Sequence, residues 1–311
     1  MTQFKAKINK MIDIIITSYN EPKSTLRAIN TFLNQDIKQD FRIIVCDPFQ
    51  EVNEFLKKNI KNKRVGFFLD PGEGKSYALN LLFKKLNSTN KEDIIILTDG
   101  DVYVSENSVS EILKAFEDKE VGCVTGHPVP IEDKSSKYGY WANLLFSGID
   151  KTRKKLSDGG KFFECSGYLF AIRKSVIQDF PIDCSEDSIL PYLFWKKGFK
   201  IKYLQNAQVY VKNPSNWKDW KNQKIRNIKG HENLDKIAPD MPRTKSFWNE
   251  IKFGWSFLFT YPKSLKQFFW TIQLYFARLN IYLTAFKELK KQASYSDGWR
   301  ENPTDSTKTL D

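Results

Sequence analysis

The chain has few of the residues that build metal–thiolate sites or disulfide frameworks. Its 311 residues include four cysteines, which are scattered and form no Cys-x-x-Cys pair. This pattern argues against a zinc site and against a disulfide-stapled domain, and it fits the reducing cytosol. The opening MTQFKAKINK also has no apolar core of the kind found in secretory signals. We therefore expect a cytoplasmic protein.

A long apolar run without charges is also missing. The most apolar segment, residues 265–286, begins with Lys266 and Gln267 and contains Arg278. An arginine at the centre of a spanning helix costs about 2.5–3.5 kcal/mol on insertion scales. We therefore do not expect this segment to cross a membrane by itself.

Positive charge, by contrast, is in excess. Lysine and arginine number 49 against 37 acidic residues, which gives a net charge of +12. Such a charge favours an anionic partner, namely a nucleotide, a nucleic acid or an acidic membrane surface. A solvated lysine-rich surface explains the charge equally well. The hydrophobic share of 41% excludes wholesale disorder and allows one large domain or two small ones.

Short apolar runs alternate with amphipathic segments between residues 12 and 124. The runs are IDIIIT, FRIIVC, RVGFFL, DIIILT and VGCVTG. This alternation predicts an α/β fold with a mostly parallel sheet flanked by helices. Ligands of such sheets bind outside the carboxyl ends of the strands. The residues to examine are therefore 17–21, Asp47, 70–75 and 99–101.

The segment GEGKS, residues 72–76, resembles the end of a phosphate-binding P-loop. The complete pattern requires a glycine five positions before Gly74, where this chain has Leu69. Asp70 would also direct a carboxylate at the phosphates, so a P-loop NTPase is disfavoured. Lys75 remains a candidate phosphate contact because it opens a helix directly after a strand. A solvent-facing lysine at a helix start is the alternative.

Two acids, Asp99 and Asp101, follow the apolar run IIILT with Gly100 between them. Their carboxylates emerge where a buried strand ends. This arrangement can coordinate a divalent cation, Mn²⁺ or Mg²⁺, that bridges two phosphates. The same three residues also occur as an ordinary acidic turn, so their context decides between the two interpretations.

That context resembles the family-two glycosyltransferases, inverting enzymes of the GT-A fold that use nucleotide-sugar donors. The resemblance covers about residues 11–229 and lies in the order of seven segments. These are IIITSYNEP, IIVCDP, GEGKSYALN, ILTDGDV, SGYLFAIRK, SEDSILPYLFWKKGFKI and WKDWKNQKIRN. It implies a GT-A domain over residues 11–230, with a nucleotide-binding half over about 11–128 and an acceptor half over about 129–230.

The resemblance implies a role for each acid and base at the predicted strand ends. Thr17, Tyr19 and Glu21 would contact the nucleotide, and Asp47 would contact the base or the ribose. Lys75 falls on the basic position of the family's third segment and would face the diphosphate. Further donor-site residues are Asp99, Gly167 and Arg226, and the implied metal ligands are Asp101 and Asp99.

The resemblance also points to a catalytic base. Displacement at an anomeric carbon requires the acceptor hydroxyl to lose its proton as it attacks, and a carboxylate can take that proton. Asp187 is the predicted base, and the negative charge of Glu186 beside it would make it a stronger one. Residues 185–187 also have the composition of a helix cap and first turn. His127 is a candidate acceptor contact, with a structural hydrogen bond as the alternative.

The segment WKDWKNQKIRN resembles a degenerate Gln-x-x-Arg-Trp box. The guanidinium group of Arg226 could donate two hydrogen bonds to phosphate oxygens. The tryptophan that ends the family box is replaced by Asn227, which favours transfer of a single sugar over processive polymerisation. Trp217 and Trp220 are candidate acceptor contacts, and His231 is a candidate further metal ligand.

Residues 231–294 are predicted to form a C-terminal aromatic helical extension. One helical stripe has spacings of three or four, with Leu265, Phe269, Ile272, Phe276, Leu279, Leu283 and Phe286. Trp270, Leu274 and Ile281 lie off this stripe, so the helix is apolar on more than one face. It either lies at a membrane interface or packs on the core. Residues 295–311 are expected to be disordered.

These observations predict a metal-dependent inverting glycosyltransferase. The resemblance makes a UDP-sugar the expected donor and a glycan or lipid-linked molecule of the cell envelope the expected acceptor, at the inner membrane surface. A basic nucleic-acid-binding protein is the alternative, because tryptophan and lysine interleave over residues 213–230. That alternative leaves the acidic strand ends unexplained, so no nucleic acid is expected. A P-loop-like NTPase and a nucleotidyltransferase of the same fold are less favoured.

Overall fold

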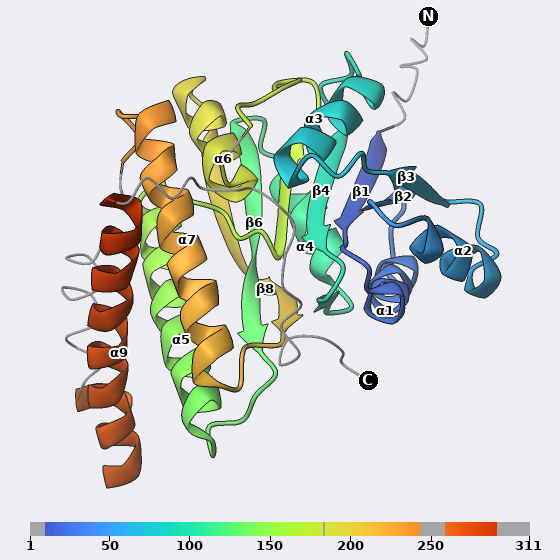
Figure 1. Ribbon diagram of the computed structural model, residues 1–311. Helices are drawn as coiled ribbons and strands as arrows, with labels where there is room; N and C mark the ends of the chain where they lie inside the picture. The colour runs from blue at the N-terminus through green and yellow to red at the C-terminus, as the bar shows by residue number, and fades with distance from the viewer. Residues whose placement is uncertain (1–9, 183, 243–258, 291–311) are drawn as a thin grey trace, which may run out of the picture.

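The computed structural model describes residues 10–182, 184–242 and 259–290 (Figure 1). The predicted alternation of strands and helices is present in the first half of the chain. Its elements are β1 (Met11–Thr17), α1 (Pro22–Leu33), β2 (Asp40–Asp47), α2 (Gln50–Asn59), β3 (Val65–Leu69), α3 (Lys75–Lys85) and β4 (Ile94–Asp99).

The second half continues the same sheet and adds longer helices. Its elements are β5 (Tyr103–Val104), α4 (Ser108–Ala115), β6 (Val121–Pro130), α5 (Lys137–Asp158), β7 (Leu169–Arg173), α6 (Glu186–Lys196), β8 (Lys200–Val211), α7 (Trp217–Ile237) and α9 (Leu265–Lys290). The Lys- and Gly-rich residues 153–161 have a composition typical of a loop, but α5 continues through residue 158.

The strands form one eight-stranded sheet in the order β3-β2-β1-β4-β7-β6-β8-β5. The first four strands are parallel to one another. Strand β7 runs antiparallel to both β4 and β6, while β8 is parallel to β6. The predicted α/β class is confirmed, and the parallel arrangement is continuous only over β1 to β4.

Strand β1 is buried on both faces of the sheet, which explains its unbroken apolar run. Ile12, Ile14 and Ile16 pack in a cluster with residues of α1, α2 and α4. Ile15 points to the opposite cluster, which contains residues of α3 and α6. Helices α3 and α6 therefore cover the same face of the sheet. Their first residues, Lys75 and Glu186, contact each other.

A third cluster joins α5, α7 and α9 (Figure 1). Leu274 and Ile281 of α9 are buried there, together with the small Ala277 and Ala285. The predicted helical extension is thus present over residues 265–290. Helix α7 is continuous across residue 230, so the expected domain boundary there does not coincide with a break in secondary structure. The expected disordered tail lies outside the described residues.

Candidate active site

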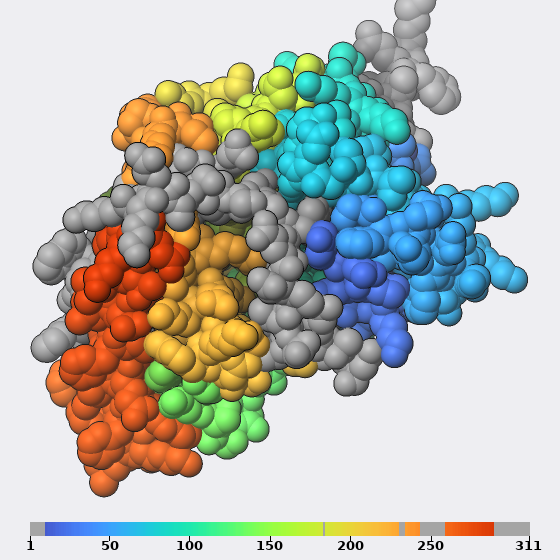
Figure 2. Space-filling model, in the orientation of Figure 1, coloured from blue at the N-terminus to red at the C-terminus, as the bar shows by residue number. Residues whose placement is uncertain are grey.

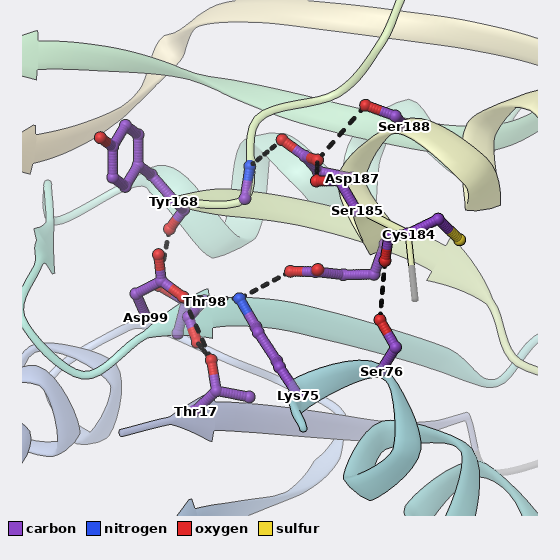
Figure 3. Close-up of polar contacts among 12 residues, drawn as sticks. Thr17, Lys75, Ser76, Thr98, Asp99, Tyr168, Cys184, Ser185, Asp187 and Ser188 are labelled. Atoms are coloured by element: carbon purple, nitrogen blue, oxygen red, sulfur yellow. Dashed lines mark hydrogen bonds and ion pairs between the residues drawn. The ribbon is translucent and has the colours of Figure 1, made fainter. Parts of the chain in front are cut away.

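The carboxyl ends of the four parallel strands meet at one edge of the sheet. Thr17 at the end of β1 lies opposite Cys46 of β2 and Asp99 of β4. Asp47 at the end of β2 lies opposite Leu69 of β3. The polar segments that follow these strands are therefore neighbours, as the alternation predicted (Figure 3).

The turn after β4 packs tightly against the loop after β1. The amide of Gly100 donates a hydrogen bond to the carbonyl of Thr17 at 2.7 Å. A Cβ atom at position 100 would lie 2.7 Å from Cβ of Ser18 and 2.9 Å from Oγ1 of Thr25. Only glycine fits here, and its presence keeps the two flanking acids at this edge.

Asp47 is the centre of a cluster of hydrogen bonds at the same edge. It is buried, and its Oδ2 accepts hydrogen bonds from Oγ of Ser18 at 2.5 Å and from the amide of Asn20 at 3.0 Å. Burial raises the pKa of Asp47, and these hydrogen bonds limit the rise. The ring of Tyr19 contacts that of Phe49 edge-on, with centroids 5.1 Å apart. The ring pair of Tyr19 and Phe49 therefore lies beside the fixed carboxylate of Asp47.

Lys75 connects the two halves of the site. Its Nζ lies 2.8 Å from Oδ1 of Asp99 and 2.6 Å from Oε1 of Glu186 (Figure 3). Burial alone would lower the pKa of Lys75, but the two carboxylates outweigh it and hold that pKa well above its usual value. Gly74 precedes the helix with φ of 107°, a conformation that favours glycine. The lysine is thus a fixed cation between two acids.

Side chains of α3 also tie this helix to the segment before α6. Oγ of Ser76 donates to the carbonyl of Cys184 at 2.8 Å. The amide group of Asn80 donates to the carbonyl of Phe180 at 2.8 Å and accepts from its N–H at 2.9 Å. These three bonds place Lys75 opposite the start of α6.

Asp187 lies in the first turn of α6 with its carboxylate held on both sides. Its Oδ2 accepts from the amide of Gly167 at 3.0 Å, and its Oδ1 accepts from the hydroxyl of Ser185 (Figure 3). Oγ of Ser188 lies 3.4 Å from the same Oδ1. The predicted base and the predicted donor-site residue Gly167 are therefore in direct contact.

Glu186, predicted to support the base, also forms an ion pair across the site. It is buried, and its carboxylate pairs with Lys75. Its negative charge therefore lies directly against the ammonium group of Lys75. No local sequence pattern indicates this pair, because its members lie in different halves of the chain.

The two predicted tryptophans of α7 differ in exposure. Trp217 is 40% exposed and stacks on Trp220, with ring centroids 5.7 Å apart. Trp220 is 2% exposed and packs on Trp141 at 5.0 Å. Of the two, Trp217 is the one open to an acceptor. The burial of Trp220 also weakens the idea of a base-stacking surface for nucleic acid.

His127 is engaged in a polar cluster between β6, β8 and α5. Its Nδ1 lies 2.5 Å from the hydroxyl of Tyr203 and 3.6 Å from Oδ1 of Asp150. Burial lowers the pKa of His127, and the carboxylate of Asp150 opposes that shift. These contacts fit the structural alternative considered for this residue.

The remaining candidates lie on helix ends and surfaces. Arg226 is exposed on α7, and Glu21 directly precedes α1. His231 falls within α7, but its side chain lies outside the part of the chain that the structure describes.

The described residues contain no group of three or more His, Cys, Asp or Glu side chains that could hold a metal ion. The predicted metal ligands Asp99 and Asp101 provide only two carboxylates for an ion. Mg²⁺ is commonly bound in this way, through one or two carboxylates with substrate phosphates and water completing the shell. Asp99 already holds the ammonium group of Lys75, so its carboxylate is suited to a cation.

The sheet topology and the acidic turn after β4 define a protein of the GT-A class. The family model of glycosyl transferase family 2 matches residues 13–180. This is more than half of the chain, which belongs to that family of transferase enzymes. The fold is also similar to a mannosyltransferase from Pyrobaculum calidifontis, solved in complex with GDP-Man and Mn²⁺. That similarity has a TM-score of 0.57 at 14% identity and covers 92% of this chain and 83% of the other.

Two curated relatives are similar to this chain. An N-acetylglucosaminyltransferase from Rhizobium meliloti (strain 1021) is 23% identical over 240 residues, which are 69% of this chain and 54% of the relative. A hyaluronan synthase from Streptococcus pyogenes is 26% identical over 176 residues, 52% of this chain and 40% of the relative. The chain thus spans about half the length of the curated relatives it matches.

Proposed function

We propose that this protein transfers a sugar from a nucleotide-diphosphate donor to an acceptor hydroxyl with inversion at the anomeric carbon. The observation that carries the proposal is that α6 brings Asp187 to the strand edge where Asp99 and Lys75 lie. Asp187 would take the proton of the acceptor hydroxyl as its oxygen bonds to the anomeric carbon. The bond from that carbon to the diphosphate breaks, and the diphosphate leaves with the electron pair.

The departing diphosphate carries negative charge, which the site can neutralise. Lys75 would turn to its oxygens, and Arg226 is the second candidate cation. A divalent ion, Mn²⁺ or Mg²⁺, would be held by Asp101 and Asp99 and would supply further positive charge there. The segment around Asp47 and Tyr19 would contact the nucleoside end of the donor.

The proposed donor and acceptor are those typical of the family. A UDP-sugar is the first donor to test, and the mannosyltransferase of similar fold makes a GDP-sugar the second. Because Asn227 replaces the tryptophan of the family box, we propose transfer of a single sugar. The acceptor would be a glycan or a lipid-linked precursor of the cell envelope, and Trp217 is the exposed aromatic that it would meet.

Calorimetric titration of three diphosphates, UDP, GDP and ADP, and of ATP into the protein, with and without Mn²⁺, tests the donor site. We expect one diphosphate to bind, and to bind roughly tenfold or more tightly when Mn²⁺ is present. Binding of none of the three would contradict the proposed donor site. Preference for ATP over every diphosphate, without need of metal, would instead support the NTPase interpretation.

The exposed side of α9 supports a location at a membrane surface. The predicted stripe faces away from the core, with Phe269 61%, Phe276 68% and Leu283 54% exposed. Figure 2 shows α9 along one edge of the molecule, beside α7. None of the described helices combines the length and hydropathy that a membrane span requires. We propose that this stripe lies in the headgroup region on the cytoplasmic side of the membrane.

The charges of α9 favour an anionic surface over a second copy of the chain. The helix contains four basic residues and one acid, Glu288. That acid is paired with Lys229 at 2.6 Å, so a second α9 would offer mainly like charges. Lys266 lies over the ring of Trp270 at 4.7 Å, which places a cation and an aromatic ring together. Such pairs suit the headgroup region.

Replacing Phe269, Phe276 and Leu283 together by serine should weaken binding to vesicles that contain phosphatidylserine. These side chains are already exposed, so the fold should be retained. We expect a roughly hundredfold loss of vesicle partition in sedimentation, because each lost side chain removes apolar area that would enter the interface.

The matched control replaces three isoleucines that are exposed elsewhere on the chain, Ile131, Ile149 and Ile182. This triple serine variant should bind vesicles like the unmodified protein. Equal binding of both triple variants would contradict the membrane proposal. Dimerisation that depends on the stripe, without vesicle binding, would show that the stripe binds a second copy instead.

A further inference from the structure

Lys75 has an arrangement that the transfer reaction alone does not require. Its ammonium group contacts Asp99, which is a proposed metal ligand, and also Glu186, which precedes the proposed base. The lysine is only 19% exposed, and Glu186 is 7% exposed. A buried carboxylate needs a compensating charge, and the lysine supplies it to two acids at once.

We propose that Lys75 is an exchangeable counter-ion that makes metal binding depend on the nucleotide diphosphate. Without donor, its positive charge lies at Asp99 and repels a divalent cation from the neighbouring carboxylates. The diphosphate brings negative charges that accommodate both cations, so Lys75 can turn from Asp99 to phosphate oxygens while its contact with Glu186 persists. This inference rests on the donor site proposed above.

The same pair makes Lys75 a positioning residue for the base. Glu186 and Asp187 are consecutive in the first turn of α6, so the salt bridge to Glu186 fixes the backbone that carries Asp187. The hydrogen bonds of Ser76 and Asn80 hold α3 against the segment that leads into α6. Movement of the Lys75 ammonium group toward a donor would therefore change the position of the backbone at the start of α6.

The test measures Mn²⁺ and UDP binding by calorimetry in the Lys75→Met variant, without turnover. Removing the internal cation should tighten binding of Mn²⁺ to the nucleotide-free protein roughly tenfold or more, because a nearby positive charge is lost. It should weaken binding of UDP in the presence of Mn²⁺ by a similar factor. A merely structural role would not move the two affinities in opposite directions.

Three further variants make the result specific. Lys75→Arg should retain both affinities within about threefold, because it keeps the charge. Lys84→Met removes an exposed lysine of the same helix and should change neither affinity. The double variant Lys75→Met/Glu186→Gln leaves no unpaired buried charge. It should show the same tightening of Mn²⁺ binding if the single variant does not fold.

Mn²⁺ binding that stays unchanged or weakens in the folded variants that lack Lys75 would overturn the counter-ion proposal. A UDP affinity that does not fall in these variants would overturn the proposal that Lys75 turns to the diphosphate. If the unmodified protein binds no nucleoside diphosphate, the proposed function fails, but the Mn²⁺ measurement still decides whether Lys75 competes with the metal. The two failures are therefore distinguishable.

Discussion

Replacing Asp187 by asparagine is expected to lower the transfer rate by roughly 10²–10⁴-fold, the usual contribution of a positioned general base. An asparagine amide cannot take the proton of the acceptor hydroxyl. Its carbonyl oxygen can still accept from the amide of Gly167, which holds Oδ2 of Asp187 at 3.0 Å. The loss should therefore appear in kcat, measured as diphosphate release with a saturating acceptor, while UDP binding stays unchanged.

The control for this variant is Asp179→Asn, an exposed acid in the loop that leads to α6. It changes the net charge equally and should leave kcat within about twofold, because exposed charges contribute little. Thermal unfolding of Asp187→Asn should show a stability change of about 1 kcal/mol or less. Turnover that survives in this variant would remove Asp187 as the base.

The strand-end half of the site could be predicted because it depends on periodicity alone. Buried runs that alternate with helices imply parallel strands, and the ends of parallel strands lie at one edge. Thr17, Asp47 and Asp99 follow from that rule, and the register of the sheet places them as expected. The position of Gly100 follows from the need for a close turn.

The contacts across the site could not be predicted, because they depend on how α3 and α6 pack. Nothing in the segment around Lys75 indicates that its partner is Glu186 as well as Asp99. Sequence reasoning therefore gave Glu186 a catalytic role beside Asp187. That role stays a prediction, and the structure adds the ion pair with Lys75, which supplies the charge that a buried carboxylate needs.

The C-terminal helix shows a second limit of periodicity. The regular stripe of large apolar residues identified the helix, but that stripe is exposed. The face that packs on α5 and α7 contains small residues, Ala277 and Ala285, beside Leu274 and Ile281. Small side chains permit close helix packing, so the most hydrophobic face of a helix need not be the buried one.

Replacing Asp101 by alanine is expected to abolish the dependence of UDP binding on Mn²⁺. The site offers two proposed carboxylate ligands, so losing one leaves the ion with Asp99, whose Oδ1 also contacts Lys75 at 2.8 Å. In calorimetry with Mn²⁺, the affinity for UDP should fall to its metal-free value. Turnover should fall roughly 10²-fold or more, because the departing diphosphate loses a neutralising charge.

Two comparisons separate loss of the metal from a general loss of negative charge. Glu106→Ala removes an exposed acid shortly after the same turn and should keep the effect of Mn²⁺. Asp99→Ala should differ from Asp101→Ala, because it also releases Lys75 from one of its two carboxylates and leaves that cation to the diphosphate. We therefore expect Asp99→Ala to retain more metal-free UDP affinity than Asp101→Ala. Mn²⁺-dependent binding that persists in Asp101→Ala would place the ion elsewhere in the site.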